Sequence, residues 1–414
     1  MAKTRRKTTP KRAASPVATA GTDKRNVFLI FAAAVYTVAV IYSIWHGVSH
    51  PVRNWDMMGY IACIVSDGTD DPKIIHERML AEIKPVVWPE LYTEYSEKNR
   101  LSADAGNFYR QIPFYRIKPL YVWAVRAVHA MGAGLAASTW LVSTFSFVVL
   151  SAALAWWRPD AANRGAWLLS LCALLLLGYL PLGTFAGYST PDPLSLMFFT
   201  LAFMLWARRR SLAGYAVCNL LCVLTRPDAL IQTIILTLYF MLFSAKDLRM
   251  KPSTATIAAG TACAGFIAVQ LATSAPGWIT LFVRGFIDDN FDFTAGEAHL
   301  TIGQYFSAIF AGLKRELINP RFIFFVLLSA GALAEAYRRR KTARLEWVWL
   351  IMAGWTAFGA RLLLFPATDE RYFYGYYLLM IIGSIELLSP LAEELLRRKN
   401  PAADTARKLL SWRL

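Results

Sequence analysis

Cysteine, histidine and acidic side chains are scarce in this sequence. Its 414 residues include five cysteines and five histidines, and Asp and Glu together number 28. Four cysteines lie inside apolar segments with no histidine nearby, so we expect core packing there and no disulfide framework. The chain also contains neither a G-x-G-x-x-G run nor a P-loop, the usual phosphate-binding loops of nucleotide enzymes. These absences argue against a nucleotide-dependent enzyme, and we predict no cofactor.

Apolar residues dominate the composition. They make up 56% of the chain, with a mean hydropathy of +0.38, which excludes an ordinary soluble domain and a disordered one. Apolar runs recur at close to the length of about 20 residues that a helix needs to cross a bilayer. The pattern predicts an all-α polytopic membrane protein with about ten transmembrane helices. The expected spans are 27–46, 135–157, 166–184, 191–207, 212–225, 228–243, 253–273, 321–337, 345–365 and 372–390.

The positions of the basic residues explain the net charge of +16. The tail 1–26 carries eight Lys or Arg, 338–344 five and 397–414 six, whereas 47–134 carries ten basic and ten acidic residues. Basic loops on one side of successive spans are the positive-inside pattern. We therefore expect both tails in the cytoplasm, the first one disordered, and a single membrane domain at 27–396. Because orientation accounts for the charge, we expect no nucleic-acid partner.

Two segments leave the membrane for any length, and this topology places both on the non-cytoplasmic side. The outer loop 47–134 contains an amphipathic aromatic helix at 117–131, and the outer loop 274–320 contains another at 301–317. If 117–131 crossed the membrane, every later basic cluster would face outward. The charge pattern therefore predicts that this helix lies in the membrane interface, with Trp123 at headgroup depth.

Charged residues at this outer face are the candidates for function. Asp56 lies in the run NWDMMGY at 54–60, and Lys118 opens the run KPLYVW at 118–123. An ionisable side chain at a membrane surface is costly to place and is usually functional. A carboxylate, a lysine and lipid-facing aromatic residues on one side of a membrane indicate chemistry on an anionic, lipid-linked substrate.

The order of these motifs resembles the GT-C superfamily of polyprenyl-phosphate-sugar-dependent glycosyltransferases, especially the lipid A aminoarabinose transferases and protein O-mannosyltransferases. That superfamily places an Asp in the first outer loop shortly after span one, as Asp56 is placed here. It then carries a Lys-Pro-Pro-Leu-Tyr-Tyr-Trp-like interfacial helix, which KPLYVW at 118–123 matches with one proline missing.

Two later motifs extend the resemblance. A second outer Asp of the superfamily is matched by Asp192 in GYSTPDPL at 187–194, without the arginine that precedes it in the family. A Leu-Thr-Lys-Gly-Pro-like break between two spans is matched loosely by LTRP at 224–227. The likeness covers roughly residues 27–245.

The resemblance implies an inverting glycosyltransferase. A carboxylate takes the proton of the acceptor hydroxyl as that oxygen attacks the anomeric carbon, and cations neutralise the departing phosphate. The implied reaction moves a sugar from a polyprenyl-phosphate donor to a lipid-linked or cell-envelope glycan acceptor, as in lipopolysaccharide synthesis, at the outer face of the bacterial inner membrane. The predicted residues are Asp56 as the base with Asp192, the phosphate ligands Lys118, Arg371 and Arg226, and the substrate-binding Tyr60, Tyr121 and Tyr372.

The two carboxylates also have structural interpretations. Asp56 would be a helix cap or the ion-pair partner of Arg53. Asp192 lies between two prolines at the start of a span, which is the usual place of an N-cap.

The cations have structural interpretations as well. Lys118 and Arg371 would extend toward the lipid headgroups. Arg226 is equally suited to stabilising the break between two spans. Arg361 lies within a span, where packing against a carbonyl or a carboxylate is its expected role.

Acidic residues in the second outer loop are the nearest approach to a metal site. Asp288, Asp289, Asp292 and His299 are close in sequence, but their spacing matches no metal-ligand pattern. The sequence favours a solvated acidic loop, and we predict no metal.

A glycolipid flippase or transporter and a non-catalytic membrane scaffold are the alternative functions. Transporters place charged residues at the bilayer midplane and often contain inverted repeats. The acidic candidates here lie at the outer face, which favours an enzyme. The expected partners are a polyprenyl-phosphate-linked sugar, a lipid or glycan acceptor and membrane lipids, and we expect a monomer.

Overall fold

Helices account for the architecture of the described chain. The computed structural model describes residues 20–99, 102–156, 182–273, 275–288, 298–367 and 369–398. Within these ranges the only β-structure is an isolated bridge between Val52 and Tyr188. The first half contains α1 (Ala20–Ser49), α2 (Asp56–Val65), α3 (Pro72–Ile83), α4 (Pro89–Thr93), η1 (Glu94–Lys98), α5 (Ala105–Tyr109), α6 (Ile112–Arg116), α7 (Pro119–Ala130) and α8 (Leu135–Trp156). The second half contains α10 (Leu182–Ala186), α11 (Asp192–Arg209), α12 (Leu212–Thr225), α13 (Ala229–Leu242), α14 (Pro252–Ala272), α15 (Trp278–Phe286), α16 (Ile302–Leu317), α17 (Pro320–Arg338), α18 (Leu345–Leu364), η2 (Glu370–Tyr372) and α19 (Tyr374–Arg398).

Five of the described helices are long and apolar enough to cross a membrane, namely α8, α14, α17, α18 and α19. The described parts of α1, α2, α12 and α13 include shorter apolar helical stretches. The all-helical, membrane-embedded class is therefore supported, whereas the count of ten spans is not. Predicted span 166–184 falls mostly outside the described residues, and α11 contains three charged residues among its 18.

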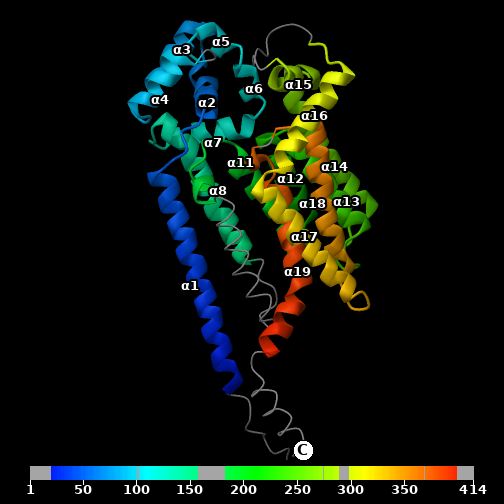
Figure 1. Ribbon diagram of the computed structural model, residues 1–414. Coiled ribbons are helices and arrows are strands. Elements are labelled where there is room, and N and C mark those ends of the chain that lie inside the picture. Colours follow the sequence, from blue (N-terminus) through cyan, green and yellow to red (C-terminus); the bar gives the residue numbers. More distant parts are fainter. Residues whose placement is uncertain are drawn as a thin grey trace, which may run out of the picture.

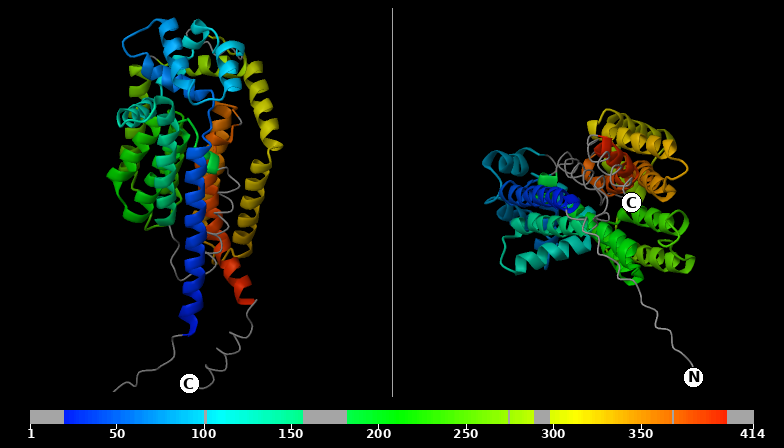
Figure 2. Two further views of the ribbon diagram at one scale, coloured as in Figure 1. Left: turned by 90° about the vertical axis from the view of Figure 1, so that its left-hand side faces the viewer. Right: turned by 90° about the horizontal axis from the view of Figure 1, so that it is seen from below.

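The long and short helices occupy different levels of the molecule. In Figure 1, the short helices α2 to α6 form the upper end, and the long helices extend downward from them. The described chain begins, at α1, and ends, at α19, toward the same lower end. The side view in Figure 2 shows α1 alongside the other long helices. Helix α1 begins at Ala20, inside the predicted tail 1–26, and residues 1–19 and 399–414 lie outside the described part.

The helices α2 to α7, here called the outer cluster, have an apolar core of their own. Met57 and Ile61 of α2 pack with Ile75 and Met79 of α3, and all four are fully buried. Gly59 allows the closest contact, because an added Cβ there would lie 2.3 Å from the ring of Tyr115 on α6. Burial of these side chains fixes the direction in which α2 starts, and the residue at its start is Asp56.

A second close approach joins the end of α1 to the segment before α11. A Cβ on Gly47 would lie 2.8 Å from Ala186, so only glycine fits there. Just beyond, the N–H of Val52 donates to the carbonyl of Gly187 at 2.9 Å. This contact brings the start of α2 near the start of α11, which are the positions of Asp56 and Asp192.

The remaining helices form a bundle with the larger apolar core. Helix α11 packs against α8 and α12, and α18 packs against α19. Glycines allow the last pair to approach closely: a Cβ on Gly354 would lie 3.0 Å from the carbonyl of Tyr376, and one on Gly383 would lie 2.9 Å from that of Trp347. Small residues at such crossings are typical of helices packed in membranes.

The two predicted amphipathic helices are present as separate elements. Helix α7 has 12 residues, which at 1.5 Å per residue is too short to cross a bilayer. Helix α16 begins with a complete capping box formed by Thr301 and Gln304. Its range agrees with the predicted 301–317, whereas 289–297 of the same outer loop lies outside the described residues.

Candidate functional site

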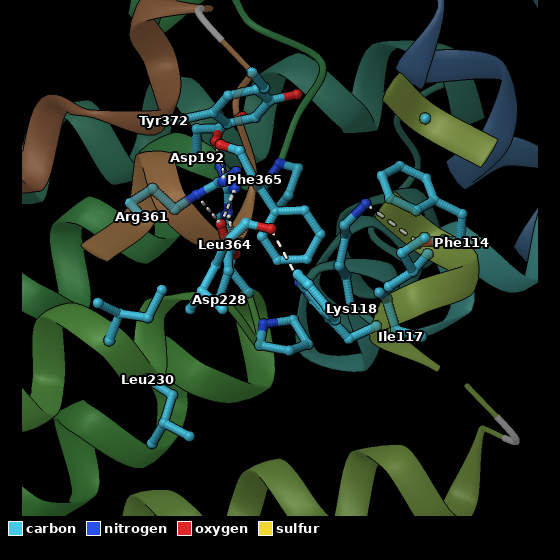
Figure 3. Close-up of a pocket in the computed structure, with 18 of the residues that line it drawn as sticks. Phe114, Ile117, Lys118, Asp192, Asp228, Leu230, Arg361, Leu364, Phe365 and Tyr372 are labelled. Carbon is cyan, nitrogen blue, oxygen red and sulfur yellow. Dashed lines mark hydrogen bonds and ion pairs between the residues drawn. The ribbon is translucent and has the colours of Figure 1, made fainter. Parts of the chain in front are cut away.

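A cavity of about 560 Å³ lies between the outer cluster and the bundle. Figure 3 shows Asp192, Asp228, Arg361 and Tyr372 together on one side of it and Lys118 with Phe114 on the other. Seven charged residues line the wall: Asp56, Lys118, Asp192, Arg226, Asp228, Arg361 and Arg371. Most of the remaining wall is apolar and includes Ile231, Phe266, Trp278, Leu281, Phe286, Leu364 and Phe365. Seven of the eight residues predicted from the sequence line this cavity, and Tyr121 is the exception.

Asp56 is the first residue of α2, where the helix dipole favours a negative charge. Its carboxylate forms an ion pair with Nη1 of Arg371. Burial alone would raise the pKa of Asp56, but the positive charges of Arg371 and Lys118 outweigh burial and hold this pKa below its usual range. Asp56 is therefore a carboxylate over the physiological pH range.

Neither structural interpretation of Asp56 agrees with the geometry. The N-cap position of α2 is occupied by Trp55, which makes no side-chain cap. Arg53 lies instead over the ring of Trp88, with its guanidinium carbon 4.6 Å from the ring centre. The partner of Asp56 thus comes from η2, more than 300 residues away in the sequence.

Asp192 is the first residue of α11 and is only 4% exposed. Pro191 holds the N-cap position and no side chain caps this helix, so the N-cap interpretation was wrong. The carboxylate forms an ion pair with Nη1 of Arg226, and its Oδ2 lies 4.0 Å from Nη1 of Arg371. Arg371 thus lies between Asp56 and Asp192 and brings the two predicted carboxylates to one place.

Lys118 is buried in an aromatic surrounding. Its Nζ lies 3.7 Å from the ring centre of Phe114, 5.2 Å from that of Tyr115 and 5.5 Å from that of Tyr60. It donates to the carbonyl of Phe114 at 3.2 Å. Burial lowers the pKa of Lys118 to about 7, although the negative charge of Asp56 opposes this.

Two consequences follow from the surroundings of Lys118. At 8% exposure it does not extend toward lipid headgroups, which corrects that interpretation. Among the residues that the structure describes, no carboxylate lies within 4.0 Å of its Nζ. A buried ammonium without an anionic partner is costly, and such groups are often found at functional sites.

Asp228 joins two arginines and was not predicted as a site residue. It accepts from Nε and Nη2 of Arg226 at 3.0 and 2.7 Å, and from Nε of Arg361 at 3.0 Å. Arg361 also donates to the carbonyl of Phe365 at 2.9 Å. The expected packing of Arg361 against a carbonyl and a carboxylate is confirmed. Arg226 holds the break between α12 and α13 and also lines the cavity, so its two interpretations are compatible.

Arg371 and Tyr372 belong to η2, the short turn between α18 and α19. Besides Asp56, Arg371 contacts Asp369 at 2.8 Å and donates to the hydroxyl of Tyr372 at 3.1 Å. Attraction to these groups keeps the pKa of Arg371 well above its ordinary value despite burial. Because its partners are protein groups, Arg371 is not directed toward the headgroups, as its structural interpretation required.

Tyr121 lies outside the cavity wall, unlike the other two predicted tyrosines. Its ring is 4.6 Å from that of Tyr60, centre to centre, and its hydroxyl donates to the carbonyl of Thr139 at 3.0 Å. Tyr121 therefore packs against Tyr60 without lining the cavity itself. Tertiary packing decides which side of a short helix faces the cavity, and the sequence pattern around Tyr121 did not show how α7 packs.

Among the searched residues, no group of three or more His, Cys, Asp or Glu side chains could hold a metal ion. His299 is exposed, and Asp288 pairs with Arg284 at 2.7 Å. Asp289 and Asp292 lie outside the described residues.

The sequence contains a signal for the site residues that were not predicted from it. The run Arg226-Pro227-Asp228 interrupts two short apolar helices, and a charged pair there is costly unless it has partners. Aromatic residues of α15, Trp278 and Phe286, also belong to the cavity wall.

Comparisons with known proteins place no constraint on this site, because no family model, curated protein or solved structure matches the chain.

Proposed function

We propose that this protein is an inverting glycosyltransferase that uses a polyprenyl-phosphate-linked sugar at the outer face of the bacterial inner membrane. One observation carries the proposal. Asp56 and Asp192 share a cavity with Lys118, whose ammonium has no carboxylate within 4.0 Å among the described residues. Two carboxylates suit an acceptor hydroxyl and a sugar, and an unpaired cation suits a phosphate.

The charge count supports a donor with one negative charge. The cavity wall contains three carboxylates and four cations, and each carboxylate pairs with at least one arginine. Lys118 is the cation left over, so the wall carries one net positive charge when Lys118 is protonated. A phosphodiester between a sugar and a polyprenol has one negative charge, which Lys118 can neutralise, whereas a diphosphate would carry at least one charge more.

The apolar part of the wall supports a lipid-linked donor. Phe266 of α14, Leu281 and Phe286 of α15 and Phe365 after α18 line the same cavity as the charged residues. A hydrocarbon chain would bury apolar surface there, at about 25 cal/mol for each Å² removed from water. A water-soluble sugar phosphate would leave this surface unused.

The proposed reaction assigns each bond and proton to a group. The acceptor oxygen forms a bond to the anomeric carbon from the face opposite the phosphate. The bond from that carbon to the phosphate oxygen breaks with its electron pair, which leaves polyprenyl phosphate beside Lys118. The acceptor proton passes to Asp56, and the anomeric configuration inverts.

The ion pair between Asp56 and Arg371 has a role in this scheme. A carboxylate held by a guanidinium is a weaker base, because the pair stabilises its charged form. A donor phosphate that attracts Arg371 would weaken this pair and return basicity to Asp56. The base would then be most active when the donor is bound.

The decisive experiment incubates the purified full-length protein in lipid nanodiscs with a panel of labelled polyprenyl-phosphate sugars and outer-membrane lipid extracts. Transfer of label with inverted configuration, abolished in Asp56→Asn, supports the proposal. A flippase would instead move intact glycolipid across proteoliposomes without cleaving it. No cleavage of any donor, with unchanged lipid movement in Asp56→Asn, would reject the enzyme and favour a scaffold.

A further inference from the structure

Asp228 lies at the start of a helix, but its side chain does not cap that helix. It occupies the N-cap position of α13, where an Asp side chain usually accepts from a backbone N–H two or three residues further on. No such side-chain bond is present, and the backbone of Asp228 is in the right-handed helical region and not in the extended region typical of a capping residue. Its two oxygens instead accept three bonds from guanidinium groups. The carboxylate is therefore committed to the arginines and not to its own helix.

Arg226 and Arg361 reach Asp228 from different helices. Arg226 ends α12 and offers Nε and Nη2, a two-point contact that fixes both the position and the plane of its guanidinium. This contact leaves Nη1 of Arg226 for Asp192. Arg361 comes from α18 and offers Nε, with its Nη1 on the carbonyl of Phe365. Asp228 thus ties α12 to α18 across the cavity wall.

Both guanidiniums face the same aromatic ring. The guanidinium carbon of Arg226 lies 4.8 Å from the ring centre of Tyr372, and that of Arg361 lies 5.1 Å from it. Cations at this distance from an aromatic face are attracted to it, but two like charges so close together repel each other. The negative charge of Asp228 between them offsets that repulsion.

From this arrangement we infer that Asp228 is a positioning residue, which holds Arg226 and Arg361 as a two-arginine clamp at Tyr372 for the anionic end of the substrate. The inference deepens the proposed function and rests on it for the identity of the substrate. The clamp acts on ground-state binding, because its bonds exist before any chemistry. Its loss should therefore change donor affinity more than turnover.

The test measures binding of undecaprenyl phosphate and steady-state transfer by the full-length protein in nanodiscs. Asp228→Asn keeps the shape of the side chain and removes its charge. We expect about tenfold weaker binding, the size expected for loss of a charge-assisted hydrogen bond, and a higher donor KM with kcat lowered less. Asp228→Glu should restore part of the affinity. Asp247→Asn is the matched control, because Asp247 is largely exposed and pairs with Arg210 at 3.4 Å, away from the cavity.

A second substitution separates positioning from simple stability. Arg361→Lys keeps the charge but cannot donate to Asp228 and Phe365 in the same planar arrangement. If Asp228 acts through Arg361, the double variant Asp228→Asn/Arg361→Lys should bind within about twofold of the weaker single variant. Unchanged binding in Asp228→Asn, or losses that simply add, would overturn the inference.

Failure of the proposed function gives a different result. If the wild-type protein binds undecaprenyl phosphate but transfers no sugar, the enzyme assignment fails while the clamp is still tested by binding. If Asp228→Asn does not fold, binding by Arg361→Lys decides alone: affinity equal to that of the wild type would overturn the clamp.

Discussion

The two sides of the cavity differ in how their charged side chains are paired. The first wall, formed by Asp56, Tyr60, Phe114 and Lys118 of the outer cluster, surrounds an ammonium with aromatic rings and one carbonyl. The second wall, formed by residues of the bundle and η2, pairs every arginine with a carboxylate. The two walls meet where Arg371 of the second contacts Asp56 of the first.

The arginines and carboxylates of the second wall are already paired with each other, whereas Lys118 of the first wall lacks an anionic partner within 4.0 Å among the described residues. Paired guanidiniums and carboxylates are costly to desolvate, but once paired they hold each other in fixed orientations. An unpaired buried ammonium has no such compensation, and the cost is recovered when an anion binds. In the proposed function, Lys118 of the first wall therefore supplies the charge that neutralises the phosphate, and Arg226 and Arg361 of the second wall fix its position.

The strongest test of the comparison removes the carboxylate at the junction. In Asp56→Asn, we expect kcat to fall by about 10²–10⁴-fold, because a general base contributes that much, while donor binding changes little. Stopped assays with labelled donor measure kcat, and undecaprenyl phosphate titration measures binding. Asp67→Asn is the control, since Asp67 forms an exposed pair with Arg126 in the same loop. Full activity in Asp56→Asn would reject Asp56 as the base.

The next test removes the unpaired cation of the first wall. Lys118→Met keeps the length and apolar stem of the side chain. We expect the donor Kd to rise about 10–100-fold, as for a lost hydrogen bond to a charged group, with a smaller change in kcat. Lys84→Met is a suitable control, because Lys84 also lies near a ring, that of Tyr92, but in the outer cluster away from the cavity. Equal losses in both variants would mean that Lys118 only stabilises the fold.

The pH dependence of donor binding also tests the role of Lys118. With a pKa of about 7 in the free protein, Lys118 is charged below that pH and neutral above it. An anion favours the charged form, so affinity should be highest below pH 7 and fall by up to about tenfold per pH unit above it. Titrations between pH 6 and 9 measure this slope. Lys118→Met should abolish it, and a slope that persists in the variant would assign the titration to another group.

The smallest expected effect concerns a buried carboxylate outside both walls. Glu316 of α16 is buried, and its Oε1 has no hydrogen-bond partner. Burial raises the pKa of Glu316 to about 7, although a hydrogen bond from Asn319 opposes this. The folded protein then binds a proton that the unfolded chain releases between about pH 4.5 and 7, so the free energy of unfolding falls as the pH rises through that window.

Glu316→Gln removes this dependence. At pH 8 its melting temperature should lie a few degrees above that of the wild type, with a smaller difference at pH 5. Thermal melts at the two pH values measure the change. A lower melting temperature at pH 8 would show that the charged form of Glu316 is satisfied in the folded protein.

Local patterns predicted the elements better than the contacts between them. The apolar runs and the amphipathic helices expected at 117–131 and 301–317 each depend on residues close in sequence, so their helices were found near the expected positions. The structural interpretation of Asp56 paired it with Arg53, three residues away, but its partner is Arg371. Tyr121 was predicted to bind substrate, but it lies outside the cavity wall and packs against Tyr60.

The sequence by itself determined the helical, membrane-embedded class and the presence of scarce charged residues at the ends of apolar helices. Hydrophobic composition and the cost of charge near lipid are properties of the chain that need no partner. Only the tertiary structure decided which carboxylate meets which arginine, and that Lys118 meets none within 4.0 Å among the described residues. Those choices depend on close packing at Gly47 and Gly59, where segments distant in the sequence are brought together.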